Sequence, residues 1–283
     1  MTRFRARVSA DGDSACWRTL ARRALRAGIA PERLDWIEDG KDDDLFPVDA
    51  PWPEEDPARA PVLSRAALTL IETALCHSDP VRHDLAYRLV WRLQDEAGLL
   101  AVSTDADVAR LRRMAQAVRR DSHKMTAFVR FREQPGCNGR RRFCAWFEPD
   151  HHILRRVAPF FANRFTDMDW LIATPRGSIA WDGETLDVRS GAFTRPELAD
   201  DLDQLWRTYY GATFNPARVK IQAMKSEMPR KYWRNLPETN DIPALLAGAD
   251  ARVRRMAAQQ AAPAPAFHHS LRKRLPRVPE DRD

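Results

Sequence analysis

The hydrophobic pattern in the first half of the chain is helical. Apolar side chains recur every third or fourth residue in three stretches, at Leu63–His77, Asp79–Asp95 and Asp105–Asp121. This spacing places them on one face of each helix. We therefore expect the three helices to pack as an antiparallel bundle, with the third helix presenting on its outer side Arg112, Arg113, Arg119 and Arg120.

From residue 126 onward the pattern alternates, which is typical of strands. Thr126–Arg132 and Arg142–Glu148 flank the turn-rich sequence EQPGCNGR and predict a β-hairpin. The elements expected after it are a helix from His151 to Phe165 capped by Asp150, strands at Asp169–Thr174, Ser178–Trp181 and Thr185–Val188, and a helix from Thr194 to Tyr210. The order ββαββα predicts a small antiparallel sheet covered by helices, so the fold class is α+β.

Changes in composition suggest where the parts of the chain begin and end. A strand at Arg3–Val8 and a helix at Asp13–Ala27 are expected near the N-terminus, and Ile242–Gln260 predicts a last helix. The expected organisation is a small α/β segment (1–36), an acidic proline-rich loop (37–60), a main α+β domain (61–258, helical over 61–122 and sheet-containing over 123–258) and a disordered Pro/Ala and basic tail (259–283).

Composition excludes several classes of protein. The chain has 283 residues, of which 44% are hydrophobic and 30% charged, as in ordinary soluble domains. It contains no apolar run of membrane-spanning length and no signal-peptide core near the N-terminus, so we expect a cytoplasmic protein. The cysteines form no C-x-x-C pair and predict neither a disulfide framework nor a zinc site: Cys16, Cys76, Cys137 and Cys144.

The uneven distribution of charge points to a polyanionic partner. The formal net charge is +6, but residues 38–56 hold nine acids against Lys41 alone and carry −8. The remainder therefore carries about +14, and nucleic acid is its natural partner. We interpret the acidic segment as a solvated loop, although it could also fold back over the basic surface.

The strongest basic segment is Asn215–Glu238. Asn215 and Pro216 favour the start of a helix, and Pro229 should end it, so that Arg230–Asn235 (the knuckle, RKYWRN) follows directly. We expect phosphate contacts from the helix and the knuckle, base stacking by one knuckle aromatic ring, and further contacts from the first predicted strand. These candidates are Arg218, Lys220, Lys225, Arg230, Lys231, Tyr232, Trp233, Arg234, Arg130 and Arg132. The alternative is a solvated helix whose Tyr232 and Trp233 fill core space.

Three residues at the junctions of predicted elements are candidates for catalysis. His123, Glu148 and His151 could together carry out acid–base chemistry, although capping and surface roles explain them as well. If the basic segment lies beside these junctions, the two would form a DNA-processing site; if not, it would be a binding surface. The Glu-Gln-Pro-Gly sequence at 133–136 is found in some uracil-DNA glycosylases, but its partner motif is missing here. Dinucleotide, P-loop, serine-hydrolase and H-E-x-x-H motifs are also missing, and we expect neither metal nor cofactor.

Several longer motifs carry a family resemblance. They are DPVRHDLAYRLVWRL, RRMAQAVRRDSHKMTAFVRFRE, AWFEPDHHILRRVAPFFANRF with DWLIATP, and LWRTYYGATFNPARVKIQAMKSEMPRKYWRNLPE. The run from Arg113 to Gly248 resembles a bacterial domain of unknown function associated with DNA metabolism. Members of that family stand alone, beside a radical SAM protein implicated in DNA repair or modification, or are fused N-terminally to a uracil-DNA glycosylase-like module.

The resemblance implies an association with DNA repair without a known reaction. The present chain ends in a Pro/Ala linker where the fused form would continue, so glycosylase activity is not expected of it. The leading hypothesis is a repair protein that binds DNA through residues 214–234, with a radical SAM or glycosylase-like protein as partner. A DNA-acting enzyme and a protein-interaction scaffold remain the alternatives.

Overall fold

The chain divides into two units, the first comprising residues 1–202 with 231–236 and the second residues 203–230 with 237–283. The computed structural model describes residues 3–40, 50–56, 61–134, 141–191, 193, 228–248, 251 and 254. The helix expected at Thr194–Tyr210 lies outside the described residues, as does nearly all of the helix expected from Asn215 to Pro229. Cys137 and the tail at 259–283 lie outside them as well.

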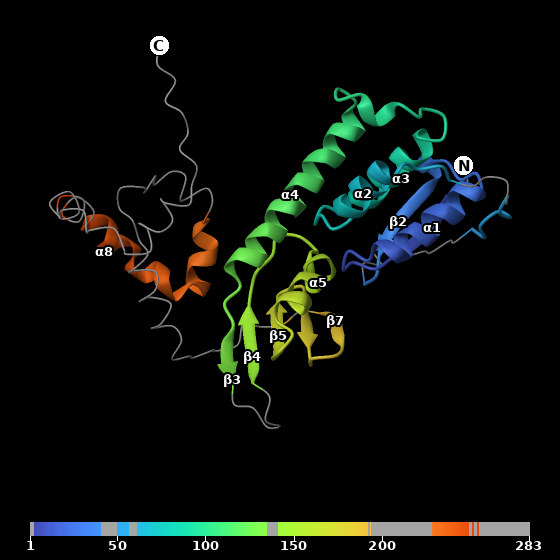
Figure 1. Cartoon of the computed structure of the whole chain (residues 1–283). Coiled ribbons are helices and arrows are strands. Elements are labelled where there is room, and N and C mark those ends of the chain that lie inside the picture. The colour runs from blue at the N-terminus through green and yellow to red at the C-terminus, as the bar shows by residue number, and fades with distance from the viewer. Residues whose placement is uncertain are drawn as a thin grey trace, which may run out of the picture. The chain divides into compact units, whose positions relative to one another are not determined.

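The N-terminal segment forms a β-α-β unit (Figure 1). Strand β1 (Phe4–Val8) pairs in parallel with β2 (Leu34–Glu38), and helix α1 (Ser14–Arg26) lies between them in the chain. The Asp13 side chain caps α1 by accepting the backbone N–H of Ala15. The strand β1 and the helix α1 are as predicted. No strand was predicted at β2, whose last two residues fall within the expected acidic loop (37–60).

Three helices follow as the apolar spacing predicts: α2 (Arg65–Ala74), α3 (Arg82–Arg92) and α4 (Ala106–Phe128). Helix α4 extends seven residues beyond the predicted end, because its helical apolar spacing continues to Met125, which is fully buried. The predicted strand Thr126–Arg132 is therefore wrong in all but its last residue: residues 126–128 belong to α4, 129–131 are neither helix nor strand, and β3 begins at Arg132.

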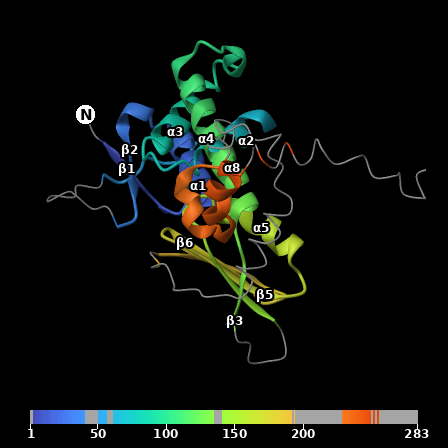
Figure 2. The ribbon, with the colours of Figure 1, turned by 90° about the vertical axis from the view of Figure 1, so that its left-hand side faces the viewer.

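A five-stranded sheet follows α4, and the views of Figures 1 and 2 show it at the C-terminal end of that helix. Its spatial order is β3 (Arg132–Gln134), β4 (Arg142–Trp146), β5 (Asp169–Thr174), β6 (Gly177–Trp181) and β7 (Leu186–Ser190). The α+β class is confirmed. The pairing of β4 with β5 is parallel rather than antiparallel, because helix α5 intervenes and returns the chain to the same edge. The other three pairings are antiparallel as expected.

Helix α5 (Leu154–Arg164) packs on the strands β6 and β7. It begins three residues later than predicted, and Ile153 is its N-cap without a side-chain hydrogen bond, so Asp150 does not cap it. Phe131, Phe161 and Trp170 meet between helix and sheet, with ring centroids about 6 Å apart. This aromatic cluster joins the start of β3 to α5 and β5.

Short helical elements complete the described chain: η1 (Pro31–Arg33), η2 (Leu99–Ala101), η4 (Arg230–Asn235), η5 (Pro237–Asp241) and α8 (Ile242–Ala247). Helix α8 corresponds to the start of the last predicted helix. Within the described part of the chain, no helix combines the length and the apolar character needed to cross a membrane.

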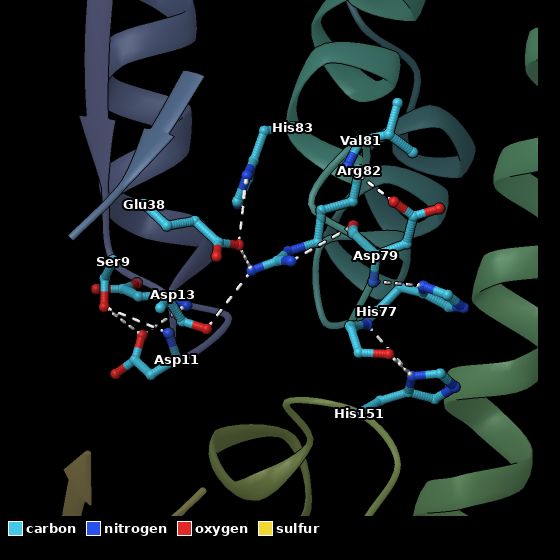
Figure 3. A network of polar contacts seen from close by, with 12 residues as sticks. Ser9, Asp11, Asp13, Glu38, His77, Asp79, Val81, Arg82, His83 and His151 are labelled. Atoms are coloured by element: carbon cyan, nitrogen blue, oxygen red, sulfur yellow. Dashed lines mark hydrogen bonds and ion pairs between the residues drawn. The ribbon is translucent and has the colours of Figure 1, made fainter. Parts of the chain in front are cut away.

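A buried ion pair connects the β-α-β unit to α3. Arg82 is fully buried, and its Nη2 lies 2.6 Å from Oε1 of Glu38 at the end of β2 (Figure 3). The same guanidinium donates to the carbonyl of Ala10, 3.5 Å away. His83 Nδ1 also lies 4.0 Å from the Glu38 carboxylate. Burial lowers the pKa of Arg82, while the charge and hydrogen bond of Glu38 oppose that shift.

The loop after β1 also contacts the other end of the first unit. Asp11 accepts hydrogen bonds from Arg155 of α5 and from Ser190 of β7. Gly12 has a φ of +81°, and a Cβ there would lie 2.9 Å from the carbonyl oxygen of His152. Only glycine therefore fits this close approach without displacing the backbone.

We expect Arg82→Met to lower the free energy of unfolding by about 3–5 kcal/mol, because it leaves the buried Glu38 carboxylate without its cation. Arg3→Met is the matched control, since Arg3 pairs with Asp35 at the surface and such pairs contribute at most about 1 kcal/mol. Urea denaturation measures both variants. Equal losses in the free energy of unfolding would contradict the larger contribution expected from the buried pair.

Candidate nucleic-acid interface

Asp121 organises the region in which the predicted site residues lie. It projects from the buried side of α4 and is 4% exposed. One carboxylate oxygen accepts the backbone N–H of His151 at 2.9 Å, and the other accepts the hydroxyl of Tyr232 at 3.4 Å. Burial raises the pKa of Asp121, while the hydrogen bond from His151 opposes this shift. The Asp121 side chain thus bonds both to the predicted junction at His151 and to the knuckle.

Tyr232 is a packing residue of the first unit. It is 1% exposed, stacks on Phe147 with ring centroids 5.0 Å apart, and lies 5.6 Å from the ring of Phe128. The ammonium group of Lys231 lies over the same ring at 4.6 Å. Because these groups enclose the ring, Tyr232 does not have a free face for a base in this arrangement. Base stacking therefore stays a prediction for Trp233, which is only partly buried.

The structure describes only some of the remaining candidate phosphate contacts in the knuckle and the predicted basic helix. Lys231 forms an ion pair with Asp150, and its side chain is 38% exposed. Arg230 is exposed. The side chain of Arg234 and the whole of the three helix candidates Arg218, Lys220 and Lys225 lie outside the described residues. Their proposed phosphate contacts stay predictions.

His151 lies in a neutral, hydrogen-bonded position. Its Nδ1 accepts the backbone N–H of Ser78 at 3.3 Å and lies 3.1 Å from the Ser78 hydroxyl (Figure 3). The ring of His77 lies against it, with centroids 4.2 Å apart. Burial, followed by the neighbouring His77, lowers the pKa of His151 to about 4. Burial also lowers the pKa of His152 to about 4, so both are uncharged at neutral pH.

The structure does not assemble the three catalytic candidates into one group. Glu148 accepts the indole N–H of Trp146 at 2.8 Å, His151 pairs with Ser78, and His123 is exposed on α4. In the part of the chain described here, no hydrogen bond joins any two of these three residues. The knuckle does lie beside the His151 junction, through Asp121, but the geometry there is that of packing and positioning.

The two strand candidates lie near the transition from α4 to β3. Arg130 precedes the strand and donates through Nη1 to the carbonyl of Ala127 at 2.9 Å. Arg132 is the first residue of β3 and is opposite Cys144 of β4. Of these two residues, which were both expected in the first predicted strand, only Arg132 therefore belongs to a strand.

A second basic surface was present in the sequence but was not interpreted there as a site. It consists of cations on the solvent side of α4, called here the α4 stripe: Arg112, Arg113, Arg119, Arg120 and Lys124. The four arginines are exposed and Lys124 is partly exposed. The sequence contains two Arg-Arg doublets seven residues apart. Seven residues are close to two helical turns, so this spacing indicated that the doublets lie on the same face of the helix.

Within the described ranges, no group of three or more His, Cys, Asp and Glu side chains has a geometry that could hold a metal ion.

Comparison with known families gives one match. A family model described as a domain of unknown function (DUF4130) matches residues 80–238, which is more than half of the chain. The matched region begins two residues before Arg82 and includes α4, the five-stranded sheet and the knuckle. Neither a curated protein nor a solved structure matches the chain.

Tyr232→Ala should lower the free energy of unfolding by about 3–5 kcal/mol, because it leaves a cavity between Phe147 and Phe128. Tyr232→Phe keeps the ring, loses only the hydroxyl contact to Asp121 and should cost about 1 kcal/mol. Urea denaturation and hydrogen exchange at residues 231–236 check this. An alanine variant no less stable than the phenylalanine variant would contradict the packing role.

Stability should fall as the pH drops from 6.5 toward 4. The folded-state pKa values of His151 and His152 lie near 4, below the ordinary 6.5, so unfolding takes up protons in this window. Each histidine should cost about 2 kcal/mol between pH 7 and pH 5. His151→Asn keeps an acceptor for Ser78 but cannot titrate, and should reduce the pH dependence by about half. Urea denaturation at both pH values gives the comparison, with His123→Asn as an exposed control.

Proposed function

The chain belongs to the DUF4130 family, a domain of unknown function, and from its own residues we propose that it binds DNA in DNA metabolism or repair. The contacts would come from residues 214–234, with Arg218, Lys220, Lys225, Arg230, Lys231 and Arg234 on phosphates and Trp233 on a base.

The observation that carries the proposal is the anchoring of the knuckle. Tyr232 is buried against Phe147 and tied to Asp121, so the neighbouring Lys231 and Trp233 are held in fixed positions at the surface of a folded unit. Positions fixed in advance lower the entropy cost of binding a ligand. The excess positive charge outside residues 38–56 supplies the attraction for a polyanion.

The same reasoning favours binding over catalysis. His151 is neutral and already hydrogen-bonded, Glu148 is engaged with Trp146, and His123 is exposed on a different element. A catalytic group needs to be within reach of its partner and of the reacting atoms. The motif resemblance supports a bacterial, cytoplasmic setting with a radical SAM repair protein or a uracil-DNA glycosylase-like protein as partner, and we include this setting in the proposal.

Full-length protein should bind a DNA oligonucleotide with an affinity that falls steeply as salt is raised. Fluorescence anisotropy at several salt concentrations gives the slope of log K against log [salt]. Lys225→Ala and Arg230→Ala should each reduce that slope by about 0.9 on duplex DNA or about 0.7 on a single strand, since each removes one phosphate contact.

Trp233→Ala tests the stacking contact separately. It should weaken binding to single-stranded DNA by about 1–3 kcal/mol without changing the salt slope. Binding that is absent at low salt, or insensitive to salt, would contradict the proposed function. Pull-down of a protein partner that survives nuclease treatment, in the absence of DNA binding, would support the scaffold alternative instead.

A further inference from the structure

The α4 stripe differs from the other arginine-rich surfaces of the described chain in lacking acidic neighbours. Elsewhere, arginines are commonly ion-paired, as in Arg18–Glu72, Arg92–Asp105 and Arg141–Glu133. Helix α4 contains only two acids, Asp107 in its first turn and the buried Asp121. Within the described residues, Arg113, Arg119, Arg120 and Lys124 take part in no ion pair.

Uncompensated cations on one helix face repel one another and do not stabilise the fold. Like charges three or four residues apart on a helix cost a few tenths of a kcal/mol per pair. Arg120 and Lys124 are four residues apart, and the doublets place further cations within the same two turns. The packing of α4 does not require these charges, since its buried side consists of other residues: Val108, Leu111, Met114, Ala115, Val118 and Met125.

The spacing of the stripe fits a nucleic-acid duplex. The two arginine doublets are seven residues apart, which corresponds to about 10 Å along a helix, and residues 112–124 span about 18 Å. The major groove of B-DNA is about 12 Å wide and is bordered by phosphates on both sides. A helix lying across or along such a groove could therefore bring each doublet to a different row of phosphates.

The stripe is also continuous with the knuckle. Tyr232 contacts Asp121 through its hydroxyl and Phe128 through its ring, and Lys124 lies between these two residues on α4, about one turn from each. Lys231, next to Tyr232 in the chain, lies over the tyrosine ring. The C-terminal end of the stripe thus lies on the stretch of α4 that Tyr232 contacts, within the same unit as Lys231.

We propose that the α4 stripe is a contact surface for the phosphate backbone of duplex DNA, with Arg112, Arg113, Arg119, Arg120 and Lys124 as its cations. The inference rests on the proposed function and extends it to a second element, 90 or more residues from the basic segment in the sequence. It assigns the stripe a role in affinity without base recognition, because arginine and lysine contacts to phosphates do not read sequence.

The test compares two doubly substituted full-length proteins. Arg113→Gln with Arg120→Gln removes two cations from the stripe. Arg22→Gln with Arg65→Gln removes two exposed helical cations from α1 and α2 and serves as the matched control. A 20-base-pair DNA duplex is titrated by fluorescence anisotropy from about 0.05 to 0.3 M salt, and circular dichroism checks that both variants are folded.

The stripe variant should lower the salt slope by about 1.8 and weaken binding tenfold to a hundredfold at the lowest salt. The control should change neither quantity, apart from a small long-range effect. Arg113→Lys with Arg120→Lys should retain the slope, because phosphate attraction depends on the charge. An RNA duplex of the same sequence and a phosphatidylserine vesicle are titrated as well, to test whether the stripe binds the phosphates of DNA or those of RNA or a lipid.

Two groups of outcomes would overturn the inference. The first is a stripe variant that binds the DNA duplex as the parent does, or a control that loses as much. The second is a stripe-dependent affinity for the RNA duplex or the vesicle alone. If the slope responds to Lys225 and Arg230 but not to the stripe, the inference fails and the proposed function stands. If the parent binds no DNA, both fail.

Discussion

One buried carboxylate joins α4 to two segments that lie far from it in the sequence. Asp121 is desolvated on α4, and hydrogen bonds to the backbone of His151 and the hydroxyl of Tyr232 satisfy it. A buried acid without such donors would cost several kcal/mol, so the fold keeps both partners in place. The same helix turns its opposite face, rich in arginine, to solvent. One side of α4 thus positions the knuckle, and the other side carries the positive charge that would attract a polyanion.

A second constraint makes the N-terminal segment part of the same structure. Arg82 and Glu38 neutralise each other inside the protein, and Asp11 bonds both Arg155 and Ser190. The family match starts at residue 80, so it contains Arg82 but not Glu38. A fragment restricted to the matched residues would carry a buried arginine without its acid. The family region of this chain therefore depends on residues that precede it.

The sequence was informative wherever the signal was local. Helix α1, the apolar spacing of α2 and α3, and the hairpin at β5 and β6 depend on residues close together in the chain, and the sequence predicted them. The end of α4 and the start of α5 were misplaced: α4 continues its helical apolar spacing to the buried Met125, and α5 begins after Ile153, which offers no capping side chain. The Asp121–Tyr232 contact could not be predicted, since it joins residues 111 positions apart. The packing of Tyr232 against Phe147 and Phe128 is equally non-local, and it is the reason why the expected role of this residue had to be corrected.

The return of residues 231–236 to the first unit makes that unit discontinuous in sequence. The residues on either side of this short run, 203–230 and 237–283, are assigned to the second unit. Within the run, Tyr232 and Leu236 are each only 1% exposed. The buried Tyr232, which the sequence predicted as a ligand contact, is the residue that fixes this run to the first unit.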